Sequence, residues 1–242
     1  MKIGIIITGY DRYPMLLTTL NSLSSCNWHD TKFILCDDLS KDERIVSIWN
    51  DFYAYEKTKG NECVLSVADE HLGLPGLSKT FRRGLDLCKD CDYVLLIPDD
   101  VVFNPYFYEA VLTATKWLDR YSICCMMEDT RGGLFGIDVV LKKNDGYHVT
   151  THADGFGVLM SRKTVDRLDW KINEKEAVET DRSLIWRSIS YQARGNIIAL
   201  DESLMEHVGN LYNATLKKEK SDSKKIYAIN LNLFERPEIL EG

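Results

Sequence analysis

Two adjacent carboxylates, Asp99 and Asp100, close an uncharged run over residues 93–98. An apolar run of this length is typical of a strand buried on both faces of a sheet. Neighbouring carboxylates repel each other, and they are costly near an apolar core without a counter-charge. A divalent cation that also binds a diphosphate would remove both problems. The same residues could form a surface turn with its acids in water, and the local sequence favours neither interpretation.

Polar side chains also follow two earlier apolar runs. Thr8, Tyr10 and Arg12 come at the end of the first run, and Asp37 and Asp38 close the second, over residues 32–36. In open parallel sheets, ligands bind beyond the carboxyl ends of the strands. Together with residues 99 and 100, these strand ends predict one ligand site. Asp37 and Asp38 could alternatively cap the helix that follows them.

The elements that must position these residues alternate along the first hundred residues. Apolar periodicity and turn residues predict strands over 3–8, 32–36, 62–68 and from 93, with helices from 14, over 43–55 and over 78–88. This alternation is typical of βαβ units and a mostly parallel sheet. The second half is less regular: we expect helices at 105–118, 162–168 and 181–191, strands at 122–127, 155–160 and 196–200, and a hairpin of 138–142 with 147–151. His207 is expected in a loop.

Composition narrows the class of protein. The chain has 242 residues, of which 45% are hydrophobic, and a net charge of −7 that argues against a nucleic-acid binder. We expect no leader, and no apolar run is long enough to span a bilayer. Seven cysteines include a Cys-x-x-Cys at Cys88 and Cys91 without a second pair at zinc-binding spacing. We therefore expect a reducing, cytoplasmic setting and no redox or zinc role for the cysteines.

The ordered set of motifs resembles the GT-A-type nucleotide-diphosphosugar glycosyltransferases, in particular the large inverting family with a Rossmann-like N-terminal half. The matching segments are residues 8–12, 33–42, 73–84, 93–101, 179–187 and 206–209. Two positions depart from the family pattern. Pro98 stands where the first Asp of the Asp-x-Asp metal motif is expected, and Leu39 replaces the usual Gly of the second-strand motif.

The resemblance implies an α/β fold of GT-A type. Its central sheet would be Rossmann-like, mostly parallel and flanked by helices, with a smaller mixed C-terminal part. We expect a single domain over residues 1–242. Within it, residues 1–103 would form the nucleotide-binding half, residues 104–215 the acceptor and catalytic half, and residues 216–242 a charged tail.

The resemblance also implies a role for each candidate site residue. Asp181 or Glu179 would be the general base, and Asp100 with His207 would bind Mn²⁺ or Mg²⁺. Strand alternation would send Asp99 and Asp100 to opposite sides, and the position that resembles the family motif favours Asp100 as the direct ligand. The residues implied for the nucleotide sugar are Thr8, Tyr10, Arg12, Asp37, Asp38, Lys79, Asp99 and Asp154. Lys79 could instead belong to a solvated helix face, His207 could be an ordinary loop histidine, and Asp154 could cap a turn.

The implied reaction moves a sugar from a nucleotide-diphosphate donor to a glycan or other hydroxyl acceptor, with inversion favoured. A carboxylate can accept a hydrogen bond from the ring N–H of uracil or guanine, so a uridine or guanosine donor is weakly favoured. Two alternatives stay open. One is a sugar-phosphate nucleotidyltransferase, although residues 9–12 do not match its Gly-rich signature. The other is a non-catalytic nucleotide-sugar or carbohydrate binder of the same fold.

Overall fold

The computed structural model describes residues 1–73, 77–127, 141–151, 153, 157–170, 183–193 and 196–208. The strands are β1 (Ile3–Gly9), β2 (Thr31–Asp37), β3 (Glu62–Val67), β4 (Tyr93–Pro98), β5 (Val101–Phe103), β6 (Ile123–Cys125), β7 (Lys142–Lys143), β8 (Tyr147–Thr150), β9 (Val158–Ser161), β10 (Ile197–Leu200) and β11 (Met205–His207). The helices are α1 (Tyr13–Ser25), α2 (Glu43–Thr58), α3 (Leu77–Leu87), α4 (Phe107–Trp117), α5 (Arg162–Arg167) and α7 (Ser183–Ala193).

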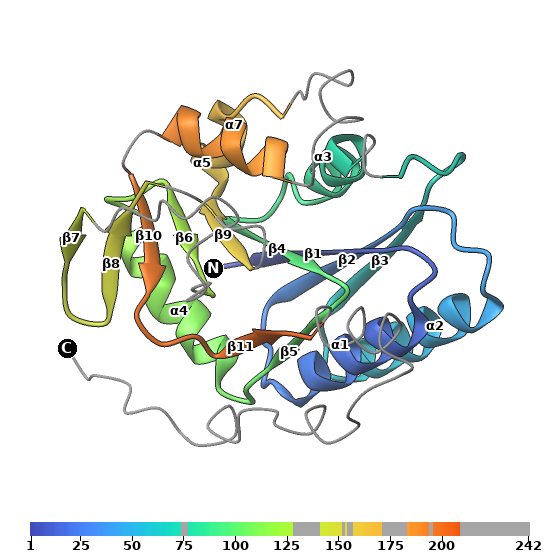
Figure 1. Cartoon of the computed structure of the whole chain (residues 1–242). Coiled ribbons are helices and arrows are strands. Elements are labelled where there is room, and N and C mark those ends of the chain that lie inside the picture. The colour runs from blue at the N-terminus through green and yellow to red at the C-terminus, as the bar shows by residue number, and fades with distance from the viewer. Residues whose placement is uncertain are drawn as a thin grey trace, which may run out of the picture.

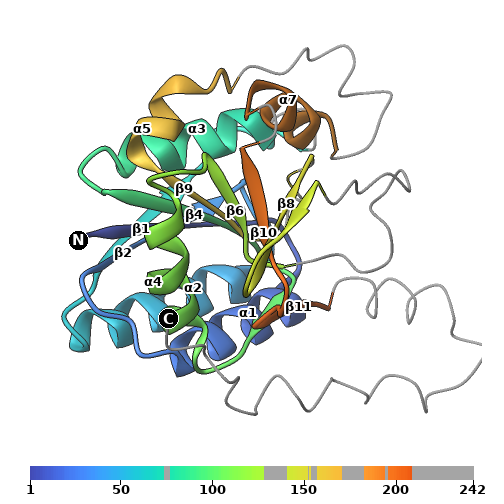
Figure 2. The same cartoon turned by 90° about the vertical axis from the view of Figure 1, so that its left-hand side faces the viewer.

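One nine-stranded sheet in the order β3-β2-β1-β4-β9-β6-β10-β8-β7 organises the described chain. Strands β1 to β4 are parallel to one another. Beyond β4 the sheet is mixed, because β9 runs antiparallel to both β4 and β6. Helices α1, α2 and α4 cover one face, and α3, α5 and α7 cover the other (Figures 1 and 2). The predicted alternation of strands and helices through residue 98 is confirmed.

Each face of the sheet carries its own hydrophobic core, because successive strand residues point to opposite sides. Ile5 and Ile7 of β1 pack in the core beneath α1, α2 and α4. Ile6 packs in the core beneath α3, α5 and α7. Gly4 also lies on the latter side, and a Cβ there would come 3.0 Å from Cys91 Sγ. Burial on both faces is the reason that this strand reads as a continuous apolar run.

The predicted hairpin is present as β7 and β8, which pair antiparallel with Lys143 opposite His148. Residues 138–140 of its first predicted strand, like the charged tail at 216–242, lie outside the described residues. All seven cysteines are free thiols. Within the described ranges, the helices lack the combination of length and apolar character that crossing a bilayer requires.

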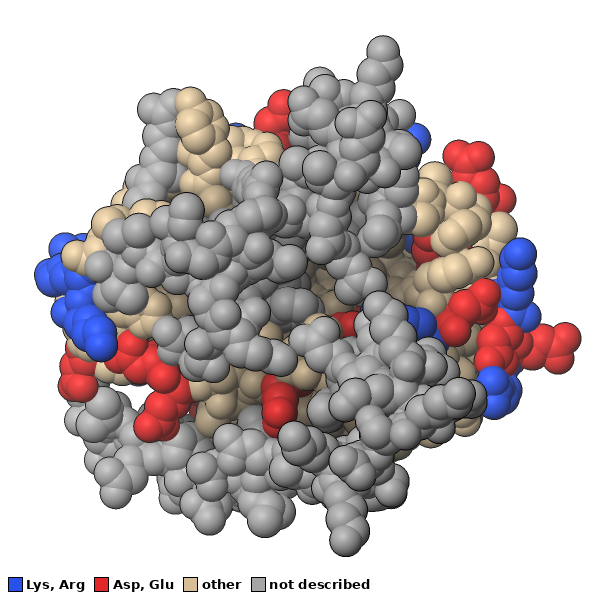
Figure 3. Space-filling view, in the orientation of Figure 1, with Lys and Arg blue, Asp and Glu red and all other residues tan. Residues whose placement is uncertain are grey.

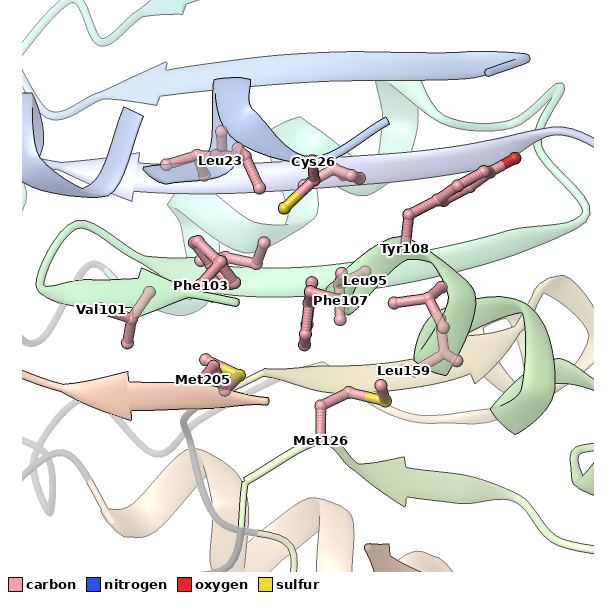
Figure 4. Packing of buried hydrophobic residues seen from close by; sticks show 14 of the residues in the cluster. Leu23, Cys26, Leu95, Val101, Phe103, Phe107, Tyr108, Met126, Leu159 and Met205 are labelled. Carbon is pink, nitrogen blue, oxygen red and sulfur yellow. The ribbon is translucent and has the colours of Figure 1, made fainter. Parts of the chain in front are cut away.

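The prediction that His207 lies in a loop is wrong. Residues 205–207 form β11, which pairs antiparallel with β5 in a separate two-stranded sheet. Met205, Val101 and Phe103 are buried in the main core, and Figure 4 shows Met205 beside Val101 and Phe103. A three-residue strand carries too short a pattern to be read from sequence. Packing of Met205 against the core fixes the strand and places the residues that follow it.

Gly157 makes this packing possible, and its replacement by alanine should destabilise the protein by about 2 kcal/mol or more. Its φ of +70° is unfavourable for L-residues, and a Cβ would collide with Met205 Sδ and lie 3.3 Å from Met126 Cβ. Gly146 is a matched control, because its φ is +77° but nothing lies within 4 Å of its Cβ position. Urea denaturation should therefore show a clearly smaller loss for Gly146→Ala, and equal losses would contradict the collision.

Candidate active site

The carboxyl ends of β1, β2 and β4 meet at one edge of the sheet. In the parallel register, Thr8 lies opposite both Cys36 of β2 and Pro98 of β4, and Gly9 lies opposite Asp37. The residues that follow each strand are therefore neighbours in space. The structure brings together the polar groups that the sequence placed at separate strand ends.

Arg12 binds both carboxylates that follow β4. Its Nε and Nη2 contact the two oxygens of Asp99, with Nε 3.2 Å from Oδ2, and its Nη1 donates to Asp100 Oδ2 at 2.7 Å. The expectation that these acids face opposite sides is wrong, since one guanidinium reaches both. The reason is local: β4 ends at Pro98, and Asp99 and Asp100 form a bend before β5 rather than continuing the strand.

The two carboxylates are almost fully buried, at 2% exposure for Asp99 and 1% for Asp100. Burial raises the pKa of Asp99 to about 6, with a contribution from the charge of Asp100 and opposition from Arg12. Burial would raise the pKa of Asp100 as well, but His207 and Arg12 outweigh it and lower that pKa to about 2. Asp100 is thus the group held most firmly as a carboxylate.

His207 reaches Asp100 through the pairing of β11 with β5. The register sets His207 opposite Val101, and Val208 N donates to Asp100 O at 2.9 Å. His207 Nε2 lies 3.1 Å from Asp100 Oδ2. Residues more than a hundred positions apart are thereby held in contact by backbone hydrogen bonds rather than by flexible side chains.

Asp100 and His207 fit a divalent cation. Two cis ligands at about 2.1 Å from an octahedral ion lie about 3.0 Å apart, close to the observed separation of 3.1 Å. Asp100 Oδ1 is buried and has no hydrogen-bond partner among the described residues, so it has free acceptor capacity there. The described residues contain no group of three or more His, Cys, Asp or Glu placed to hold a metal. An ion here would therefore take its remaining ligands from a bound diphosphate and water.

Asp37 and Asp38 shape the loops of the site. Asp37 accepts hydrogen bonds from Ser40 N at 2.7 Å and from Trp49 Nε1 at 3.2 Å. Asp38 accepts from Leu72 N at 3.0 Å and from Gly73 N at 2.9 Å. Both acids are buried, so the helix-capping alternative accounts for neither of them fully: Asp42 is the residue that caps α2, by accepting from Arg44 N.

His71 belongs to the site and was missed by the sequence reasoning. Its ring stacks on Tyr10 with centroids 3.9 Å apart and an interplanar angle of 20°. Its Nδ1 lies 2.9 Å from Asp38 Oδ2, and its side chain is 42% exposed. The signal that could have found it is its place just after the strand at 62–67, at a further carboxyl end of the parallel sheet.

Asp11 was also missed as a positioning residue. Its Oδ1 accepts from Lys41 N at 2.7 Å and Asp42 N at 3.0 Å, and its own N donates to Ser40 Oγ. This clamp holds the loop after β2 against the loop after β1. Within it, Leu39 has a φ of +64°, the conformation that favours glycine. The departure from the family pattern at Leu39 therefore keeps the turn and adds strain to it.

Of the remaining candidate site residues, Lys79 alone lies within the described residues. Lys79 is exposed on α3, whereas Arg83 donates to Asp37 O at 2.9 Å and to Ser66 O at 3.2 Å, so it ties β2 to β3. Three predicted site residues, Asp154, Glu179 and Asp181, lie outside the described residues. Acidic and basic side chains lie next to each other at both margins of the face shown in Figure 3.

The sequence matches no protein-family model and no curated protein. The fold, in contrast, is similar to that of solved glycosyltransferases. Residues 1–349 of S. aureus TarS give a TM-score of 0.58 at 17% identity, covering 89% of this chain and 63% of that one. GalNAc-T7 with UDP, GalNAc and Mn²⁺ gives 0.62 at 14%, covering 86% and 44%. A Pyrobaculum calidifontis mannosyltransferase with GDP-Man and Mn²⁺ gives 0.55 at 11%, covering 84% and 55%.

These likenesses show that the chain has a GT-A-type fold, as predicted. The chain spans less than two thirds of the length of each of these proteins. At such low identities, the similarity establishes the fold alone. The ligands named for those structures are ligands of those enzymes.

Proposed function

We propose that this protein is a metal-dependent glycosyltransferase that moves a sugar from a nucleotide-diphosphate donor to a hydroxyl acceptor. The observation that carries the proposal is the contact of His207 with Asp100, 3.1 Å apart beside Arg12 at the carboxyl ends of the parallel strands. Support also comes from solved proteins of this fold, whose structures hold UDP, UDP-GlcNAc or GDP-Man. The seven free thiols are compatible with a reducing compartment such as the cytosol.

Each residue of the site would have a separate role in such a reaction. Asp100 and His207 would hold the cation, which when bound supplies a Lewis acid for the diphosphate leaving group. An oxygen-rich shell suits manganese or magnesium, and manganese accepts the one imidazole more readily than magnesium does. Asp99 would contact the ribose or a water of that shell, and Lys79 would add positive charge beside the diphosphate. We assign Asp181 or Glu179 as the base toward the acceptor, and Asp154 to the donor-sugar pocket.

The nucleoside would lie between the loops after β1, β2 and β3. Tyr10 and His71 offer aromatic faces there, and Thr8 lies at the end of β1. Asp38 holds the loop of residues 71–73 through two backbone N–H groups, and Asp37 holds the loop after β2 by accepting from Ser40 N. A carboxylate that accepts N–H groups in this way also suits the ring N–H of uracil or guanine.

Asp38→Ala should weaken binding of uridine diphosphate (UDP) by about tenfold or more, because the loop of residues 71–73 loses both of its anchors. Isothermal titration calorimetry with UDP, GDP, CDP and ADP would measure the loss and rank the bases. Asp37→Ala should weaken binding less, since its oxygens accept from Ser40 N and Trp49 Nε1 and hold no residue of the 71–73 loop. If neither variant changes nucleotide affinity, this strand end does not hold the nucleoside.

Donor hydrolysis separates an enzyme from a binder. The protein would be incubated with a panel of UDP- and GDP-sugars and Mn²⁺, and release of the nucleoside diphosphate would be followed with and without chelator. Slow, chelator-sensitive release supports the proposal. Tight donor binding without any release, even with a panel of sugar acceptors, would favour the non-catalytic alternative. Release of pyrophosphate from a sugar phosphate and a nucleoside triphosphate would instead favour the nucleotidyltransferase.

A further inference from the structure

The Asp100 oxygen that would bind a metal already contacts a cationic side chain of the protein, Arg12. Arg12 Nη1 and His207 Nε2 both approach the same oxygen, Asp100 Oδ2, at 2.7 and 3.1 Å. We propose that Arg12 is an exchangeable counter-ion: it neutralises Asp99 and Asp100 before ligands bind, and moves to the diphosphate when the nucleotide and metal arrive. This inference rests on the proposed function and concerns the order in which that site is filled.

The charge balance of the site requires such a partner. Two carboxylates with 2% and 1% exposure cannot stay ionised next to each other without positive charge nearby. Arg12 supplies a fork of donors, with Nε and Nη2 on Asp99 and Nη1 on Asp100. The planar guanidinium suits this contact, and it suits two phosphate oxygens equally well.

The local structure allows the side chain to exchange while the backbone stays fixed. Arg12 O accepts from Met15 N and Leu16 N, both at 3.0 Å, so the residue is held at the start of α1. The side chain itself is 28% exposed, in contrast to the buried acids that it contacts. A change of side-chain rotamer would then move the guanidinium from the carboxylates toward a bound ligand.

Exchange would make metal and nucleotide binding depend on each other. A divalent ion on Asp100 and His207 meets repulsion from the guanidinium while Arg12 remains in place. Within the described residues no third metal-binding side chain helps to overcome it. A diphosphate relieves this repulsion in two ways, by binding the guanidinium and by adding oxygen ligands for the ion. Arg12 therefore acts as a positioning residue that suppresses metal binding until the nucleotide is present.

The test is a titration of Mn²⁺, followed by electron paramagnetic resonance of the free ion, with and without UDP. Without UDP, Arg12→Gln should bind Mn²⁺ at least about tenfold more tightly than the wild type, because competition and repulsion are both removed. With UDP present, the difference in Mn²⁺ affinity between variant and wild type should shrink. The ratio of the Mn²⁺ dissociation constant without UDP to that with UDP should therefore be smaller in the variant. Arg162→Gln is the control: it removes a partly buried arginine that pairs with the exposed Asp166 on α5, and it should leave both constants unchanged.

Arg12→Lys covers the case in which Arg12→Gln does not fold. Lysine keeps the charge but loses the fork, so its Mn²⁺ affinity without UDP should lie about threefold above that of the wild type. The inference is overturned if the folded variants bind Mn²⁺ without UDP no more tightly than the wild type. Because this titration contains no donor and no turnover, that result leaves the glycosyltransferase proposal standing. A failed donor-hydrolysis assay, in turn, would leave the exchange of Arg12 intact.

Discussion

Asp100→Asn should abolish the dependence of nucleotide binding on Mn²⁺ and lower sugar transfer by at least about 100-fold. Asparagine keeps the shape of the side chain but removes the charge that attracts the ion. In the part of the chain that the structure describes, the buried Oδ1 has no hydrogen-bond partner to lose, and Arg12 keeps its contacts with Asp99. The fold should therefore tolerate the change, and calorimetry with UDP in the presence and absence of Mn²⁺ would measure the effect directly.

Two further variants make this result specific. Asp166→Asn removes an exposed carboxylate that pairs with Arg162 on α5, and it should behave as the wild type. His207→Ala should weaken the Mn²⁺ effect without abolishing it, because the diphosphate can replace one ligand. Unchanged Mn²⁺ dependence in Asp100→Asn would refute the metal site, whereas an unchanged result in His207→Ala would remove only the imidazole ligand.

Sequence reasoning succeeded where local pattern and topology carry the information. The buried run over residues 93–98 and its alternation with helices predict a parallel sheet, and the sheet brings residues 8–12, 37–38 and 99–100 to one edge. The contact of Asp100 with His207 was expected from the family resemblance. Its cause, the pairing of β5 with β11, was not, because strands of three residues leave no periodic signal.

The site residues that the sequence did not reveal act through contacts between loops. The role of Asp11 depends on backbone N–H groups of residues 41 and 42, and the role of His71 depends on a ring stack with Tyr10. Neither contact has a spacing along the chain that could reveal it. The directions of Asp99 and Asp100 were wrongly predicted for a similar reason. Strand alternation does not hold in the bend that they form, where one guanidinium contacts both.

The general base is the remaining assignment with a large expected effect. Asp181 and Glu179 lie outside the described residues, shortly before α7 begins at Ser183. An inverting transfer needs a carboxylate that takes the proton of the acceptor hydroxyl as the sugar leaves the diphosphate. Asp181→Asn keeps the size of the side chain and removes its basicity, so turnover should fall by roughly 10²–10⁴-fold. Donor affinity should change little, because the base would face the acceptor.

Steady-state kinetics on matched variants would assign the role. Glu179→Gln is the control within the same motif: near-normal turnover there, with collapse in Asp181→Asn, supports Asp181, and the reverse result moves the base to Glu179. Nuclear magnetic resonance of the product at early times should show a glycosidic bond of opposite anomeric configuration to the donor. If both variants stay active, or if the donor configuration is retained, the single-displacement mechanism with a carboxylate base does not operate in this site.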